Sequence, residues 1–220
     1  MTLDPVRLPR AAAYLASLPQ GLESFPGCRV RDVTVEPYAR AFGAMAEEPG
    51  LPAPLVDLFA GVGGGSTYPE VVFQAAHLVV RDRVFEDDAP FYEWIFNANA
   101  NLFDRPIVRS LMRLVSPSLI VLGAAKRWGA FHHGSELTTD RVVISGDRAE
   151  TFSHLAFPSG LFSSVFLGGL EHVFMAALLA SRARDPRVKL ARVADTGPGT
   201  LGGHPIENQA RATYQVSWQA

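Results

Sequence analysis

The spacing of apolar residues changes near Gly129 from a helical to an alternating pattern, and this change constrains the fold more than any other feature. Before Gly129, apolar side chains recur every three or four residues, as at Val72, Ala76 and Val79, which is the period of a helix with one buried face. After Gly129, short segments alternate between apolar and polar residues in the manner of strands. The chain therefore predicts an α+β fold, with helices packed on one side of a twisted antiparallel sheet of about four to five strands.

Four helical segments are predicted in the middle of the chain and a longer one follows later. The middle segments span residues 69–85, 90–103, 107–115 and 118–128, and they are expected to form the apolar bulk of the fold. The later helix extends from residue 161 to about residue 184, where Asp185-Pro186 ends it. Strands are predicted at residues 131–137, 141–144, 148–157, 188–193 and 212–218, and the glycines between residues 197 and 203 predict a hairpin turn.

The first 67 residues are rich in proline and glycine and give weaker signals. Residues 28–35 alternate like a short strand, and residues 37–46 and 51–59 have the pattern of short helices. No linker separates two cores, so residues 1–220 are predicted to form a single domain, with a core at residues 68–220 and an N-terminal extension at residues 1–67.

Composition and charge exclude several classes of function. Hydrophobic residues make up 48% of the 220 residues and charged residues 19%, which suits a packed interior. The net charge is -2, and no block of five or more basic residues could neutralise successive phosphates, so nucleic acid is not expected as a partner. The longest apolar stretches are shorter than the ~20 residues that a bilayer requires, so no transmembrane segment is predicted.

The cysteine content and the first residues indicate the compartment. Cys28 is the one cysteine, so it can form neither an internal disulfide nor a site with several thiolate ligands. The first nine residues carry Asp4, Arg7 and two prolines before any apolar run, unlike a signal peptide. We therefore expect a reducing, cytoplasmic location.

The aromatic residues are more numerous than one narrow helix face can bury, so either the middle helices are enclosed on all sides or the rings line a cavity or an oligomer interface. These residues are Phe91, Tyr92, Trp94, Phe96, Phe103, Phe162, Phe166 and Phe174. If a cavity is present, the histidines of the predicted helices and of one strand could supply polar selectivity. The predicted ligand-binding residues are His77, Trp94, His154, Phe166 and His172.

Each of these histidines also has a simpler interpretation. His77 and His172 lie on predicted helices, where a histidine at the edge of the core usually donates to a carbonyl or a carboxylate. His154 lies on a predicted strand, whose alternation would direct it inward together with Phe152 and Ala156.

Several short segments resemble an uncharacterised family of myxobacterial paralogues. They are Tyr68-Pro69, LMRLVSPS at residues 111–118, RWG at residues 127–129, GGLE at residues 168–171 and YQVSW at residues 214–218. That family is itself similar in layout to haem-nitric-oxide-binding and vinyl-reductase-type small-molecule-binding domains. The resemblance covers about two thirds of the chain and leaves residues 1–67 unassigned. It implies an apolar cavity between the helices and the sheet, in which related domains hold a ligand.

Haem is one cofactor that such a layout could hold. A haem domain would need an axial histidine on a helix facing the cavity, and this chain has no match to the Tyr, Ser and Arg signature that holds the haem propionates in the related domains. The sequence therefore identifies no cofactor.

His132, His133 and Glu136 form the densest cluster of groups that could bind a metal ion or act as a base. On a strand, however, adjacent side chains point to opposite faces, so His132 and His133 cannot both reach one ion. The alternation predicts that one histidine is exposed and that the other is hydrogen-bonded to a neighbouring strand.

Three functions follow from these observations. The leading hypothesis is a module without catalytic activity that binds a hydrophobic small molecule or takes part in signalling. The first alternative is a protein-interaction domain that forms a homodimer or a heteromeric complex through exposed aromatic residues. The second alternative is a metal-assisted or general-base enzyme centred on His132, His133 and Glu136.

Overall fold

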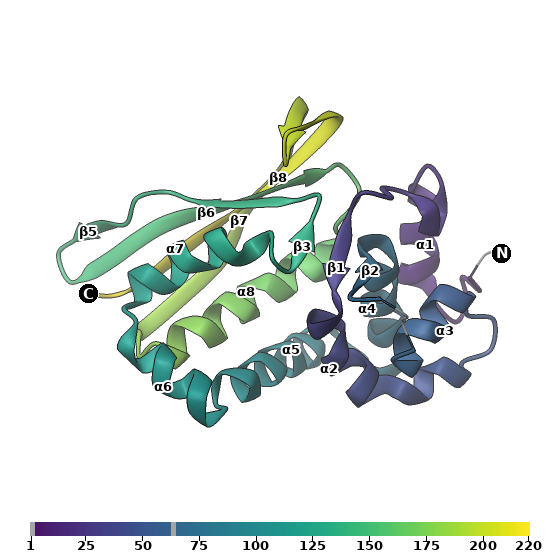
Figure 1. The fold of residues 1–220 in the computed structure, drawn as a ribbon, viewed down its shortest axis with the longest axis horizontal. Helices are drawn as coiled ribbons and strands as arrows, with labels where there is room; N and C mark the ends of the chain where they lie inside the picture. Colours follow the sequence, from purple (N-terminus) through teal and green to yellow (C-terminus); the bar gives the residue numbers. More distant parts are fainter. Residues whose placement is uncertain (1–2, 63–64) are drawn as a thin grey trace.

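The computed structural model describes residues 3–62 and 65–220, and its helices and antiparallel sheets form the α+β fold that the sequence predicts (Figure 1). The helices in the described residues are α1 (Pro9–Ser17), α2 (Asp32–Phe42), α3 (Ala53–Ala60), α4 (Glu70–Val84), α5 (Asp88–Phe103), α6 (Pro106–Leu114), α7 (Pro117–Trp128) and α8 (Ser164–Ala180). The strands are β1 (Arg29–Arg31), β2 (Thr67–Pro69), β3 (His132–His133), β4 (Glu136–Thr139), β5 (Val143–Ser145), β6 (Arg148–Pro158), β7 (Arg184–Leu201) and β8 (His204–Gln219).

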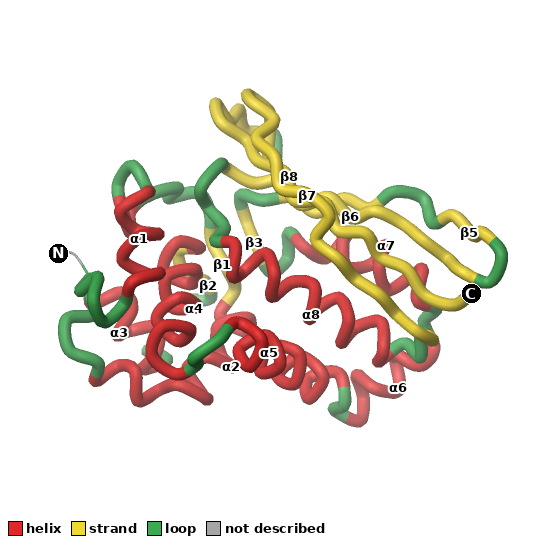
Figure 2. Tube along the Cα trace, turned by 180° about the vertical axis from the view of Figure 1, so that it is seen from behind, coloured by secondary structure: helices red, strands yellow, loops and turns green. Residues whose placement is uncertain are grey.

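The larger sheet has five strands and one face covered by helices. Its strands follow the order β4-β6-β8-β7, with β5 paired to β6, and all of these pairs are antiparallel. Burial alternates along β8, where Tyr214, Val216 and Trp218 are buried and their neighbours are more exposed. α8 packs against β7, α7 packs beside β4, and α5 lies against α8 (Figures 1 and 2). The predicted layering of helices on one side of a twisted antiparallel sheet is therefore confirmed.

The smaller sheet connects the N-terminal part of the chain to its centre. β1 lies between β2 and β3, with Val30 opposite both Tyr68 and His132. The predicted strand at residues 28–35 is wrong beyond Arg31, because α2 begins at Asp32. The carboxylate of Asp32 favours the first turn of a helix, and the apolar residues that follow also fit a helical spacing.

α4 is the central helix of the fold. Every residue from Glu70 to Arg81 is buried, including the polar residues Gln74 and His77. α1 and α3 pack against α4 from the N-terminal part of the chain, and α8 packs against it from the C-terminal part. One continuous hydrophobic core results, and it contains Leu8, Leu58 and Phe59 as well as the apolar residues of α4 and α8.

α6 departs from the prediction that the four middle segments form the apolar bulk. It contributes no buried residue, and its apolar residues lie at the surface. A short amphipathic helix has the same sequence pattern whether its apolar face meets the core or remains uncovered, so the pattern could not decide between them. α8, by contrast, contributes eight buried residues to the core.

β7 and β8 form a long hairpin whose tip projects beyond the helices (Figure 1). The predicted strands at residues 188–193 and 212–218 are parts of these longer strands. The predicted hairpin turn is confirmed at Gly202-Gly203, where both residues have positive φ (57° and 82°), the conformation of a two-residue β-turn. Gly197 and Gly199 lie at irregularities of the strand register instead of in a loop.

The predicted strand at residues 131–137 is two short strands in different sheets. β3 pairs with β1, β4 pairs with β6, and Gly134 between them has φ +78°. A Cβ atom on Gly134 would lie 2.5 Å from Sγ and 3.0 Å from Cα of Cys28. The chain therefore needs glycine at Gly134 both for its backbone conformation and for the close approach of Cys28.

Replacing Gly134 by alanine is expected to lower the free energy of unfolding by about 3 kcal/mol or more, because backbone strain and overpacking add. Gly146→Ala is the matched control, since Gly146 also has positive φ (62°) but no atom within 4 Å of its Cβ position. The control should lose only about 1–2 kcal/mol. Chemical denaturation of both variants measures the difference, and equal losses would contradict the proposed contact with Cys28.

Candidate functional site

The structure brings three of the predicted ligand-binding residues into one buried aromatic cluster. The ring of His77 lies 4.5 Å from that of Tyr38 and 5.4 Å from that of Phe166, measured between ring centroids. Trp94 joins the cluster through Tyr38, at 4.9 Å. The aromatic cluster consists of Tyr38, Phe42, Phe73, His77, Phe85, Phe91, Trp94 and Phe166.

Both ring nitrogens of His77 have hydrogen-bond partners. Nδ1 lies 3.3 Å from the carbonyl oxygen of Phe73, and Nε2 lies 2.6 Å from the hydroxyl of Tyr38. A carbonyl can only accept, so Nδ1 carries the proton and Nε2 accepts from Tyr38. Burial lowers the pKa of His77 to about 3, so the ring is neutral near pH 7. His77 is thus a hydrogen-bonded core histidine, the simpler of its two interpretations.

Of the other two predicted histidines, His172 meets the edge of the aromatic cluster through Tyr92, whose ring lies 6.2 Å from that of Phe91, and His154 lies on the large sheet. His172, on α8, is half-buried and stacks on Tyr92 at 5.2 Å, and burial lowers its pKa. His154 lies on the outer face of the large sheet, so the inward direction predicted for it is wrong. The inward residues of β6 alternate with His154 and include polar Thr151 and Ser153. A shift of one position exchanges the two faces of a strand. Because Thr151 and Ser153 are polar although they are buried, the apolar pattern assigned His154 to the wrong face.

His132 and His133 point in opposite directions, as the alternation predicts. His133 is exposed, and Nδ1 of buried His132 lies 3.0 Å from Oε2 of Glu70. The partner is the first residue of α4, whereas the prediction placed it on a strand. Nε2 of Gln74 donates to Oε1 of Glu70 (3.1 Å), and the Trp128 ring stacks on His132 at 4.2 Å.

Glu136 lies away from both of these histidines, on the outer side of the large sheet. The three residues of the metal hypothesis are therefore not brought together. In the part of the chain that the structure describes, no three His, Cys, Asp or Glu side chains form a group that could hold a metal ion.

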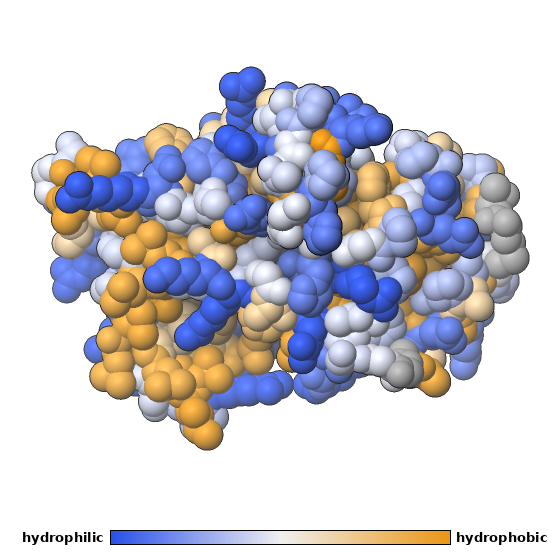
Figure 3. Space-filling model, turned by 45° about the horizontal axis from the view of Figure 1, so that its top comes forward, coloured by the Kyte–Doolittle hydropathy of each residue, from blue (hydrophilic) through white to orange (hydrophobic). Residues whose placement is uncertain are grey.

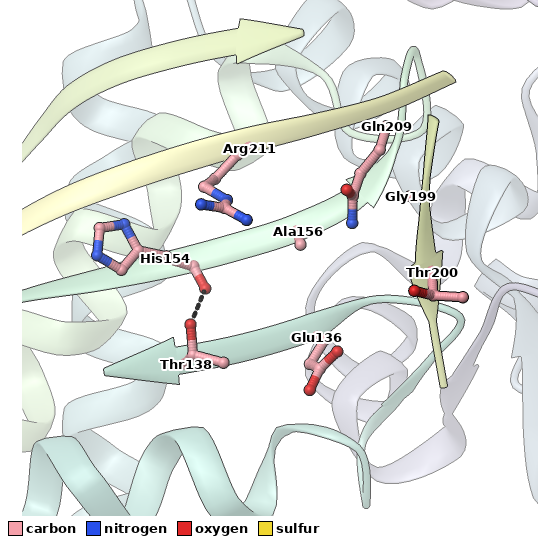
Figure 4. Close-up of a pocket in the computed structure, with 8 residues that line it drawn as sticks. All are labelled: Glu136, Thr138, His154, Ala156, Gly199, Thr200, Gln209 and Arg211. Atoms are coloured by element: carbon pink, nitrogen blue, oxygen red, sulfur yellow. Dashed lines mark hydrogen bonds between the residues drawn. The ribbon is translucent and has the colours of Figure 1, made fainter. Parts of the chain in front are cut away.

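A shallow polar hollow on the outer face of the large sheet contains two of the residues singled out from the sequence, His154 and Glu136 (Figure 4). Its volume is about 310 Å³. The His154 ring is held by Asp140 (3.2 Å) and Thr213 (3.1 Å). The lining residues are Glu136, Thr138, His154, Ala156, Gly199, Thr200, Gln209 and Arg211.

A larger groove lies between the tip of the β7–β8 hairpin and the segment that leads into β1. Its volume is about 800 Å³, within the range of small-molecule sites. We call it the ribbon groove. Its apolar wall consists of Pro19, Phe25, Pro26, Pro158, Leu201, Pro205 and Ile206. Sequence reasoning missed it because its walls come from four separate parts of the chain, at residues 19–28, 134, 158–159 and 195–209.

The polar side chains of the ribbon groove are those of Ser159, Asp195, His204, Glu207, Asn208 and Gln209. Asp195 and Glu207 line it, and no lysine or arginine is among its lining residues in the described part of the chain. Oγ of Ser159 donates to Asp195 (2.7 Å). Cys28 is also in the wall, and burial, followed by the charge of Glu70, raises its pKa to about 12, so it is an unreactive thiol.

One residue of the ribbon groove has an unusual backbone. Phe25 has φ +54°, a left-handed conformation that bulky residues rarely adopt. The strained turn is held by a hydrogen bond from the Cys28 amide to the Phe25 carbonyl (2.8 Å). Phe25 lines the groove, and residues in such conformations are often found at binding sites.

Comparison with known protein families, curated proteins and solved structures finds no match to this chain. The resemblance to the myxobacterial family stays a prediction, and the function has to be argued from the geometry of the chain itself.

Protonation of His77 should make the fold sensitive to acid. The pKa of His77 is about 3 in the folded state and about 6.5 in the unfolded state, so between these values the unfolded state binds more protons. The free energy of unfolding is therefore at its full value above pH 6.5 and decreases as the pH falls toward 3. The expected slope is about 1.4 kcal/mol per pH unit in that window. Denaturation midpoints of His77→Gln should lack this contribution, and exposed His133→Gln should keep it. An unchanged slope in His77→Gln would exclude His77 as the cause.

The neighbouring histidines offer a second test. His132→Ala removes the partner of a buried carboxylate and is expected to lower the free energy of unfolding by roughly 3 kcal/mol. His133→Ala, one position later and exposed, should change it by no more than about 0.5 kcal/mol. Guanidinium denaturation measures both, and a small effect of His132→Ala would show that the contact with Glu70 contributes little.

Proposed function

We propose that this chain is a binding module without catalytic activity that takes an apolar small molecule in the ribbon groove. The observation that supports it is the groove itself, about 800 Å³ in volume, with an apolar wall of seven residues beside six polar ones. Small-molecule sites usually have this composition, because apolar contacts supply affinity and a few polar groups fix orientation.

The ribbon groove is a better candidate than the aromatic cluster that the sequence singles out. Rings of the cluster are packed against one another, and His77 uses both of its nitrogens within the protein. A ligand there would have to displace close-packed side chains, which is unfavourable in an interior as dense as a crystal. The groove is open and needs no such displacement.

The charges of the ribbon groove select the class of ligand. Asp195 and Glu207 line the groove together with His204, and no lysine or arginine is among the described lining residues. A ligand with an anionic group would meet like charges in a partly desolvated site, where repulsion is stronger than in water. We therefore propose a neutral or cationic apolar ligand, with Glu207 and Asn208 able to accept hydrogen bonds from it.

The probe for this proposal is phenylnaphthylamine, a neutral apolar fluorophore, compared with the anionic anilinonaphthalene sulfonate. The chain should bind the neutral probe and should bind the anionic one more weakly. Ile206→Gln, in the groove wall, should weaken binding of the neutral probe about tenfold, equivalent to ~1.4 kcal/mol of lost apolar contact. The matched control is Ile144→Gln on β5, whose side chain is exposed and does not line the groove. Equal affinities of the two variants would contradict the proposed site.

A second candidate function, docking onto a larger partner, is favoured by a different observation. Apolar residues of α6 and of the start of α7 are exposed on a surface that shares no residue with the ribbon groove. This candidate is independent of the first, and a chain could combine both.

A further inference from the structure

The apolar row of α6 faces away from the protein. The side chains of Ile107, Leu111 and Leu114 are 78%, 59% and 84% exposed, and their spacing of four and three residues places them on one face of the helix. Leu119 of α7 is also exposed, at 59%. These four residues define the α6 surface. Figure 3 shows a continuous apolar region at the lower left, the side on which Figure 1 places α6.

An exposed apolar row of this kind is typical of surfaces that meet a large partner. The half-buried residues of α6, Val108 and Met112, lie on its inner side, so the helix is already seated on the protein and its outer row is left uncovered. Single exposed leucines are common in proteins, but a contiguous apolar row along a whole helix usually meets another protein or a membrane.

The charges around the α6 surface distinguish between these partners. α6 and the residue before it carry three basic residues, Arg105, Arg109 and Arg113, and no acidic one, although the whole chain has a net charge of -2. In the described residues, only Arg109 among them has a carboxylate within 4.0 Å, that of Asp104, and all three are exposed.

The basic residues of α6 also have the geometry of a helix that lies in a membrane interface. Arg109 and Arg113 follow Ile107 and Leu111 by two positions, which is about 200° around the helix. Their face is therefore opposite the apolar row, and their long side chains can bend toward lipid headgroups while the apolar row enters the acyl boundary.

We infer that the α6 surface binds the surface of a bilayer containing anionic phospholipids. Two copies of the chain meeting through this surface would bring six arginines to one interface, since a twofold interface apposes the same patch. An anionic bilayer supplies both the apolar layer and the opposite charge. Within the described residues no single helix is long and apolar enough to cross a membrane, and the one helix pair that qualifies by length and composition, α6 with α7, bends by 116°. The proposed binding is therefore to the surface of the bilayer.

The test is sedimentation of the full chain with vesicles of phosphatidylcholine alone or mixed with phosphatidylglycerol. Binding should be at least about tenfold stronger to the mixed vesicles, and about 0.5 M salt should weaken it, because salt screens the attraction. Leu111→Gln/Leu114→Gln should abolish it. Val143→Gln/Ile144→Gln is the matched control, with two exposed apolar residues on β5, and should bind like the parent chain.

The remaining variants separate the inference from its alternatives. Arg109→Gln/Arg113→Gln should lose the preference for phosphatidylglycerol, at roughly fivefold per basic residue. Ile206→Gln in the ribbon groove should bind vesicles like the parent chain, and loss of binding there would mean that the groove takes lipid and would overturn the inference. Absence of binding to the mixed vesicles, or binding that survives Leu111→Gln/Leu114→Gln, would also overturn the inference. So would a dimer, seen in light scattering, that the same double variant dissociates.

Discussion

The buried carboxylate of Glu70 is the interaction on which the arrangement of the other elements depends. Glu70 opens α4 and is almost completely buried, where an unpaired carboxylate would be strongly unfavourable. His132 and Gln74 bind its two oxygens, and its amide donates to the carbonyl of Cys28 (2.9 Å). These contacts fix the start of α4 against β3 and against the segment before β1. Gln74 in turn accepts from Ser163 at the start of α8 (3.4 Å), so one polar group orients four parts of the chain.

The position of α4 explains why the aromatic residues form a core instead of a cavity. A helix buried along most of its length needs neighbours on all sides, and α2, α5 and α8 supply rings to one of those sides. His77 is tolerated there because Tyr38 and the Phe73 carbonyl satisfy both of its nitrogens, and burial keeps it neutral. The ribbon groove lies at the periphery, where the β7–β8 hairpin projects past the helices.

Local periodicity was sufficient to predict the α+β class and the middle helices, because each of these is specified within its own segment. It also predicted the opposite directions of His132 and His133. It failed for His154, where Thr151 and Ser153 are buried through hydrogen bonds that a count of apolar residues does not register. The ribbon groove could not be predicted, since it exists only after distant segments meet. For α6, the amphipathic pattern was read correctly, but no sequence pattern tells whether a partner within the chain covers the apolar face.

The ribbon groove and the α6 surface lie at opposite parts of the molecule and differ in charge. α6 lies below the large sheet at the end away from α1, whereas the hairpin tip rises above the sheet on the side of α1 (Figures 1 and 2). The described lining of the groove has two acidic residues and no lysine or arginine, whereas residues 105–114 have three arginines and no acidic residue. An anionic bilayer would attract the basic α6 surface and repel the acidic residues of the ribbon groove. The two proposals are therefore compatible in one orientation of the chain. In that orientation the groove faces away from the bilayer and remains open to a ligand from solution.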